Sequence, residues 1–166
     1  MSKAALLALV AGLATATVID LRSRRIPNDL TAAMVGVGLG LAATGTSGIT
    51  VAASFTGFFL GLALMMPGYV LGATGAGDVK LMGAVGAIVG PALVVSAFLF
   101  TAIAGGVLAV IVATRRQRLA VTVAQTGLLV TGPGTAPQKI RAAGGPSRFA
   151  YGPAIAVGSI LAALLA

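Results

Sequence analysis

Long apolar stretches, separated by short charged or glycine-rich connections, constrain the fold of this chain more than any other feature. Hydrophobic residues make up 58% of the 166 residues, and only 8% are charged, whereas a typical soluble domain has about 25% charged residues. The third and fifth hydrophobic segments are long enough to cross a membrane alone, since a span needs about 20 residues. We therefore predict one all-α domain over residues 1–166, a polytopic membrane bundle of about six transmembrane helices. The six hydrophobic segments cover residues 4–19, 31–43, 49–71, 79–89, 92–113 and 150–166.

The basic residues indicate how these segments cross the membrane. Ten of the 11 Lys and Arg residues lie in, or directly after, the first, third and fifth connections, and only Lys3 lies on the other side. Because cytoplasmic loops carry the excess of Lys and Arg, these connections are predicted to be cytoplasmic and both termini extracytoplasmic. The fifth connection, residues 114–149, is a long basic loop. Its apolar stretch at 119–130 is interpreted as an interfacial amphipathic helix or a short re-entrant segment.

The composition excludes several kinds of chemistry. The chain has no Cys and no His, so it has no disulfide, no thiol nucleophile and no imidazole base or metal ligand. Its acidic residues are Asp20, Asp29 and Asp78, which make a poor cation site without other acids nearby, so no metal or cofactor is predicted. The net charge of +8 is not accompanied by the basic helix or aromatic platform of a nucleic-acid-binding protein, and no nucleic-acid partner is predicted.

Two of the carboxylates fall on the same predicted face of the membrane. Asp20 follows the first hydrophobic segment and Asp78 precedes the fourth, so both belong to cytoplasmic ends of helices. Two carboxylates in a low-dielectric site tend to share one proton. Such a pair supplies a general base that activates water and a general acid that protonates a peptide carbonyl. We therefore expect the two carboxylates to lie close enough to share a water molecule.

Each aspartate also has a structural interpretation. Asp78 fits the N-cap of the fourth helix, a position that favours Asp. Asp20 fits an ion pair with one of the arginines that follow it at the end of the first helix. For Asp29 the preferred interpretation is an N-cap at the start of the second helix, with Asn28 as the competing cap.

Three motifs follow one another along the chain. Residues 20–28 (DLRSRRIPN) contain an Asp, a short basic stretch and Ile-Pro-Asn, and residues 75–81 (GAGDVKL) contain Gly-x-Gly-Asp before Val-Lys-Leu. Residues 151–156 (YGPAIA) open the last segment. Together, in this order and topology, they resemble the signatures of the type IV prepilin peptidase family. Ala150 stands where that family commonly has Pro.

The resemblance implies a membrane-embedded aspartyl endopeptidase of the bacterial inner membrane. Members of the family remove the short basic leader of type IV prepilins and pseudopilins at the cytoplasmic face, which implies such a precursor and the lipid bilayer as partners. Asp20 and Asp78 match the catalytic aspartates, and Gly75 and Gly77 match the loop that carries the second one. The chain resembles the minimal form found with tight-adherence pili, which implies peptidase activity and leaves N-methyltransferase activity, the oligomeric state and the order of base and acid open.

Three further residues are candidates for binding substrate or shaping the loops near the aspartates. Lys80 is interpreted either as a contact to the substrate backbone or as a lysine that snorkels to the membrane interface. Pro27 and Asn28 are expected to order the first loop or to begin the second helix. Two other functions remain as alternatives: a non-catalytic assembly subunit of a pilus or secretion machine, and a small ion-coupled carrier. A carrier predicts an inverted repeat and acids near mid-membrane, and the sequence shows neither.

Overall fold

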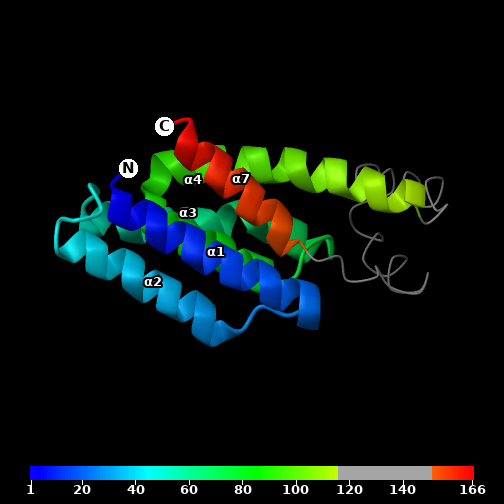
Figure 1. The fold of residues 1–166 in the computed structure, drawn as a ribbon, viewed down its shortest axis with the longest axis horizontal. Helices are drawn as coiled ribbons and strands as arrows, with labels where there is room; N and C mark the ends of the chain where they lie inside the picture. Colours follow the sequence, from blue (N-terminus) through cyan, green and yellow to red (C-terminus); the bar gives the residue numbers. More distant parts are fainter. Residues whose placement is uncertain (116–150) are drawn as a thin grey trace.

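The computed structural model describes residues 1–115 and 151–166, which form helices joined by short loops (Figure 1). Over these residues there is no β-strand, and the predicted interfacial stretch at 119–130 lies outside them. Lys3–Ser23, Val51–Val70 and Ala76–Ile111 are long and apolar enough to cross a membrane. The described part of the chain is therefore all-helical and has the long apolar helices of a membrane protein, as predicted. Its helices are α1 (Lys3–Ser23), α2 (Asn28–Ala43), α3 (Val51–Val70), α4 (Ala76–Arg115) and α7 (Gly152–Leu164), of which α2 and α7 are shorter apolar helices.

A sharp reversal divides α4 into two legs, residues 76–89 and 91–115. Gly90, between them, has φ 82° and ψ 176°, a conformation that residues with a side chain rarely adopt. Pro91 suits the first turn of the second leg, because it has no N–H group to leave unpaired there. The legs run in opposite directions (Figure 1), which confirms the predicted break between the fourth and fifth hydrophobic segments. The described residues therefore contain six helical segments.

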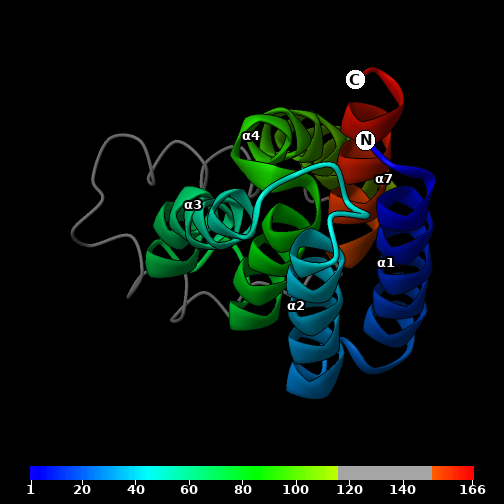
Figure 2. The same ribbon diagram turned by 90° about the vertical axis from the view of Figure 1, so that its left-hand side faces the viewer.

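The first leg of α4 forms the centre of the bundle. Every residue from 81 to 90 is buried. The helices α2 and α3 pack against this leg from two sides, as seen along the length of the bundle (Figure 2), and α7 packs against α4 and α1. The side chains from residue 81 onward on this leg are therefore held by neighbours from several helices.

The close packing of α3 on this leg depends on glycine. A Cβ atom placed on Gly57 or on Gly86 would overlap the carbonyl group of the other residue, so the two backbones are in contact. At the same contact, Ser54 Oγ donates a hydrogen bond to the Ala87 carbonyl oxygen over 2.6 Å. Close approach at small residues, together with hydrogen bonds between helices, is a common way for membrane helices to associate.

Gly57→Ala is expected to lower the free energy of unfolding by about 1–3 kcal/mol, the usual cost of overpacking. The added methyl group meets backbone atoms of Gly86, which cannot rotate away as a side chain would. Gly40→Ala on α2 is the matched control, because a Cβ at Gly40 has no atom within 4 Å. Thermal unfolding of the purified variants in detergent compares them, and equal midpoints would contradict the close α3–α4 contact.

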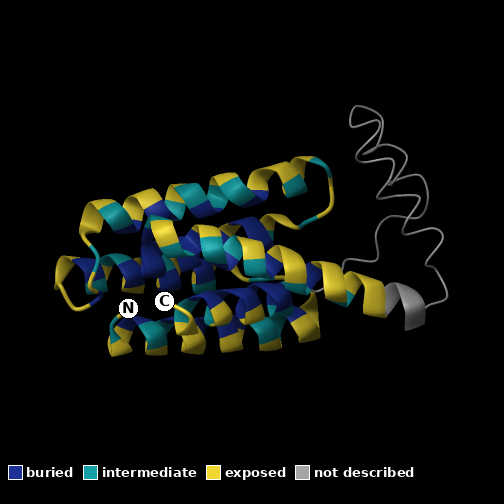
Figure 3. Cartoon of the chain, turned by 90° about the horizontal axis from the view of Figure 1, so that it is seen from above, coloured by how far each residue is buried: buried dark blue, intermediate teal, exposed yellow. Residues whose placement is uncertain are grey.

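Many large apolar residues are exposed on the outside of the bundle, where Figure 3 colours the exposed positions yellow. On the second leg of α4, Leu99, Ile103 and Val107 recur every four residues and are all exposed. Residues four apart share one face of a helix, so they form an apolar row that points away from the other helices. Such a row suits contact with lipid and is unusual on a soluble protein.

The two ends of the bundle differ. The N- and C-termini lie together at one end (Figure 1). The end of α1 and the starts of α2, α4 and α7 lie at the other end, which contains the candidate site.

The helix boundaries differ from the predicted segments by a few residues. The first helix extends four residues beyond the predicted segment and includes Asp20, whereas α2 begins at Asn28 and α4 begins at Ala76, three residues before their segments. The last helix covers residues 152–164. Hydropathy finds only the apolar part of a helix, but backbone hydrogen bonds continue through its polar first and last turns.

Candidate active site

Asp20 lies in the last turn of α1 and is buried, with 5% of its surface exposed. Arg24 closes this turn: it adopts a left-handed conformation with φ 52°, and its N–H donates to the Asp20 carbonyl oxygen over 2.8 Å. The C-terminus of a helix has partial negative charge, which disfavours a carboxylate. The stability of α1 therefore does not explain an Asp at this position.

The partner of the Asp20 carboxylate in the described residues is the backbone of α7, not one of the arginines that follow it. The Gly152 N–H donates to Asp20 Oδ2 over 2.9 Å. Gly152 is the first residue of α7, and unpaired N–H groups with partial positive charge at a helix N-terminus stabilise an anion. A Cβ atom on Gly152 would lie 2.8 Å from Asp20 Oδ2. Glycine at this position therefore allows the α7 backbone to reach the carboxylate.

Asp78 lies in the first turn of α4 and is also buried, with 8% exposed. Its Oδ2 accepts a hydrogen bond from the Gly75 N–H over 2.9 Å. Gly75 directly precedes the helix and Asp78 is its third residue, so this bond is the acidic half of a capping box. The predicted N-cap role of Asp78 is therefore wrong. Asp78 is the third residue of α4 and caps the helix from within its first turn. Gly77 faces Ile26 and leaves space for the loop before α2, since a Cβ there would lie 3.2 Å from the Ile26 Cβ.

The two buried carboxylates belong to one electrostatic cluster. The charge of Asp20 acts on Asp78, and the charge of Asp78 acts on Tyr151, the residue before Gly152. Burial raises the pKa of the Tyr151 hydroxyl above its ordinary value, and the Asp78 carboxylate raises it further. Three helix ends, from α1, α4 and α7, therefore bring Asp20, Asp78 and Tyr151 to the same region.

The second leg of α4 holds Tyr151 in place. The Tyr151 ring packs directly against Gly105, where a Cβ atom would overlap it. Its hydroxyl makes a long hydrogen bond, 3.5 Å, to the Thr101 carbonyl oxygen. The sequence predicted a motif at 151–156 but no role in the site for Tyr151 or Gly152. The available signal was their place at the start of the last hydrophobic segment, on the same predicted face of the membrane as both aspartates.

The third acid has a different environment. Asp29 is exposed in the first turn of α2. The predicted N-cap role of Asp29 is wrong, as is that of Asn28, because the N-cap residue is Pro27 and no side chain caps the helix there. Pro27, with φ −62°, supplies the turn into α2, as expected for a residue that shapes the first loop.

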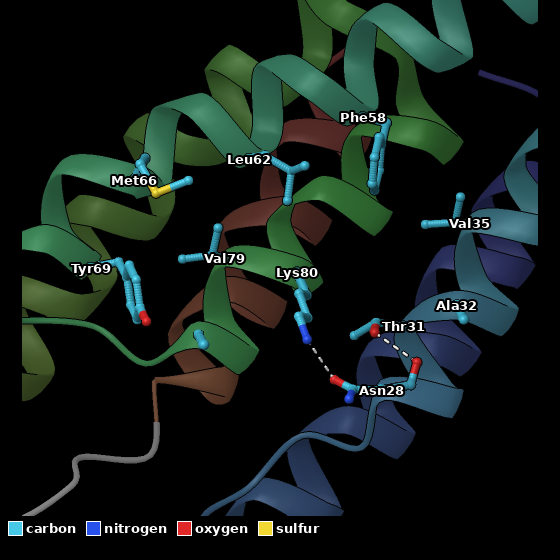
Figure 4. A pocket seen from close by; sticks show the side chains of 11 residues that line it. Asn28, Thr31, Ala32, Val35, Phe58, Leu62, Met66, Tyr69, Val79 and Lys80 are labelled. Carbon is cyan, nitrogen blue, oxygen red and sulfur yellow. Dashed lines mark hydrogen bonds between the residues drawn. The ribbon is translucent and has the colours of Figure 1, made fainter.

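Lys80 and Asn28 interact with each other. Lys80 Nζ donates to Asn28 Oδ1 over 2.8 Å and joins the start of α4 to the start of α2 (Figure 4). Asn28 thus orders the region after the first loop through its side chain. The Lys80 ammonium points toward the start of α2 (Figure 4).

The paired groups at the site are two carboxylates and the backbone N–H groups that donate to them. Within residues 1–115 and 151–166, no group of three or more His, Cys, Asp or Glu side chains is placed to hold a metal ion. Two buried, oriented carboxylates can transfer protons to and from a water molecule and a peptide bond.

Residues 7–110 match the model of the type IV leader peptidase family, a match that includes both buried aspartates. The chain belongs to this family. The resemblance seen in the sequence is confirmed, and the family implies aspartic peptidase activity in general terms. No curated protein and no solved structure matches the chain. The motif at 151–156 lies outside the residues that match the leader peptidase family. The evidence that it lies beside Asp20 is the hydrogen bond from the Gly152 N–H to the Asp20 carboxylate.

Proposed function

We propose that the protein is a prepilin leader peptidase, which removes the short basic leader of type IV pilin or pseudopilin precursors at the cytoplasmic face of the bacterial inner membrane. Asp20 and Asp78 form the catalytic pair in this proposal. It is supported chiefly by the contrast among the three acids. Two of them are buried on different helices and oriented by backbone N–H groups at one end of the bundle, whereas Asp29 is exposed.

The proposed chemistry uses the two carboxylates in opposite protonation states. The ionised carboxylate takes a proton from water as the water oxygen attacks the peptide carbonyl carbon, and the protonated one gives its proton to the carbonyl oxygen. As the tetrahedral intermediate collapses, the C–N bond breaks and the amine nitrogen takes up the proton that came from water. The carboxylate that acted as the acid takes back its proton from the hydroxyl of the intermediate as the C=O bond re-forms. Among the described residues, each carboxylate is held through Oδ2, which leaves Oδ1 to bind the shared water.

The glycines before Asp78 have a role in substrate binding in this proposal. Gly75 has no side chain to obstruct a peptide that approaches Asp78. Gly77 lies in the first turn of α4 against Ile26 and contributes by letting the loop before α2 lie close to the site. Gly75 is exposed. The scissile bond would then lie beside Asp78.

The proposed topology has six membrane crossings, with both termini outside the cytoplasm. The two termini lie at one end of the bundle and the aspartates at the other. The basic residues of the first connection, and Lys80 in the second turn of α4, lie at the aspartate end. The positive-inside rule makes that end cytoplasmic. The leader of a pilin precursor is on that side of the membrane before cleavage.

Pilin processing tests this function directly. The chain is co-expressed with a prepilin from the same genome, and the mass of the pilin is followed in membranes with and without the chain. We expect loss of the basic leader, with the cut just before the apolar pilin helix, only when the chain is present.

The absence of processing for every prepilin of that genome, with the chain folded in the membrane, would contradict the peptidase. That result would favour an assembly subunit. A cut at another place in the pilin would contradict the proposed leader specificity while retaining a peptidase.

A further inference from the structure

An apolar groove lies between α2, α3 and the first leg of α4 (Figure 4). Its volume is about 640 Å³. The first leg forms its floor at Val79 and Lys80, directly after Asp78 in the sequence, yet neither Asp20 nor Asp78 lines it. The groove therefore begins next to Asp78 in the sequence, but the two aspartates are not part of its lining.

The groove is elongated along α3. Phe58, Leu62, Met66 and Tyr69 line one wall, and their spacing of three or four residues places them on one face of the helix. From Phe58 to Tyr69 the wall is about 16 Å long, at 1.5 Å per residue. Val35 of α2 faces the same space. A groove with an apolar wall of this length suits an extended hydrocarbon chain.

Polar groups gather at one end of the groove, the end that also contains the aspartates. Lys80 Nζ donates to Asn28 Oδ1, which leaves the Asn28 side-chain NH₂ as a donor, and the Tyr69 hydroxyl lies at the same end (Figure 4). The Thr31 hydroxyl already donates to the Asn28 carbonyl oxygen over 2.9 Å. Within the part of the chain that the structure describes, no carboxylate lines the groove, and the partner of the Lys80 ammonium is a neutral amide. This end therefore offers a positive charge and hydrogen-bond donors, a set that selects an anion.

We propose that the groove binds an anionic phospholipid, with the phosphate against Lys80 and Asn28 and an acyl chain along α3. An amphiphile with an acceptor-rich negative head and an apolar tail matches both parts of the groove. Basic pockets between membrane helices bind anionic lipid headgroups in this way. The lysine stem packs along the apolar wall while its ammonium reaches the headgroup.

The charges at this end favour a lipid over the apolar helix of a substrate. The substrate proposed above has a basic leader next to its apolar helix. Lys80 and the exposed Arg22, Arg24 and Arg25 of the first loop would repel that leader, whereas they attract a phosphate. The lipid site does not depend on the proposed peptidase function.

Native mass spectrometry of the purified protein tests the lipid site. The protein is mixed in detergent with phosphatidylglycerol or with phosphatidylcholine of the same acyl chains, and the lipid-bound fraction is measured. We expect preferential retention of phosphatidylglycerol, and an affinity about fivefold lower for Lys80→Gln, the effect of one lysine near a membrane surface. Lys3→Gln removes the same charge at the opposite end of the bundle and is expected to bind like the wild type.

A second variant tests the acyl-chain part of the groove. Ala32→Trp adds bulk at an exposed lining position of α2 and is expected to reduce phosphatidylglycerol binding while thermal unfolding stays near that of the wild type. Equal retention of both lipids by the wild type, or equal binding by Lys80→Gln and Lys3→Gln, would overturn the proposal. So would a raised KM for prepilin in Ala32→Trp in bilayers of phosphatidylcholine alone, because that result would assign the groove to the substrate helix.

Discussion

Asp20→Asn and Asp78→Asn are each expected to lower the rate of leader removal by about 10³-fold or more, the scale of lost general acid–base catalysis. An amide neither accepts nor releases a proton at neutral pH, so one step of the proposed mechanism is lost in each variant. The amide oxygen still accepts the hydrogen bond from Gly152 or from Gly75. The fold around the site should therefore survive, and the loss would report on chemistry.

The measurement is the initial rate of prepilin cleavage by purified enzyme in detergent or bilayers, with thermal unfolding as the check on folding. Asp29→Asn is the matched control. Asp29 is exposed, and a surface change of this kind should alter the rate by about twofold at most. If either buried-aspartate variant kept more than about a tenth of the wild-type rate, the aspartyl pair would not be the catalyst.

Gly152→Ala is expected to lower kcat by about 10²-fold, since a displacement of about 1 Å at a catalytic group has effects of this size. The new Cβ would lie 2.8 Å from Asp20 Oδ2, closer than two such atoms can approach, so the carboxylate or the start of α7 must shift. The substrate contacts beside Asp78 stay in place. The effect on KM should therefore be smaller than the effect on kcat.

Gly106→Ala on the second leg of α4 is the control for this experiment, because a Cβ at Gly106 meets no atom within 4 Å. It should keep wild-type kinetics and should unfold at the same or a higher temperature, since Ala favours a helix more than Gly does. Steady-state kinetics with the same prepilin compares the two variants. Wild-type kcat in Gly152→Ala would show that contact between α7 and Asp20 is not needed for activity.

Much of the fold can be predicted from this sequence, because hydrophobic length and charge bias are properties of single segments. The apolar runs predict helices, and Gly90-Pro91 predicts the break inside α4. The polar ends of the helices are less predictable. Asn28 and Ala76 begin their helices before the apolar runs do, and the capping of α4 by its own third residue is only one of several possibilities that the sequence allows.

The site was predicted in part. Asp20 and Asp78 could be placed at one membrane face from topology, and the family match supports the general activity. Two contacts that complete the region were missed, that of Gly152 with Asp20 and that of Lys80 with Asn28. The partners are 132 and 52 residues apart in sequence, and no local pattern determines which residues pair across helices at such separations.

The reversal at Gly90 gives α4 a part in positioning both acids. Its first leg carries Asp78, and its second leg holds the ring of Tyr151, whose neighbour Gly152 orients Asp20. The angle between the two legs therefore contributes to the spacing of the carboxylates, although the bend lies at the opposite end of the bundle from them. The geometry of the proposed catalytic pair then depends partly on Gly90, a residue with positive φ that lies a full helix length away from both carboxylates.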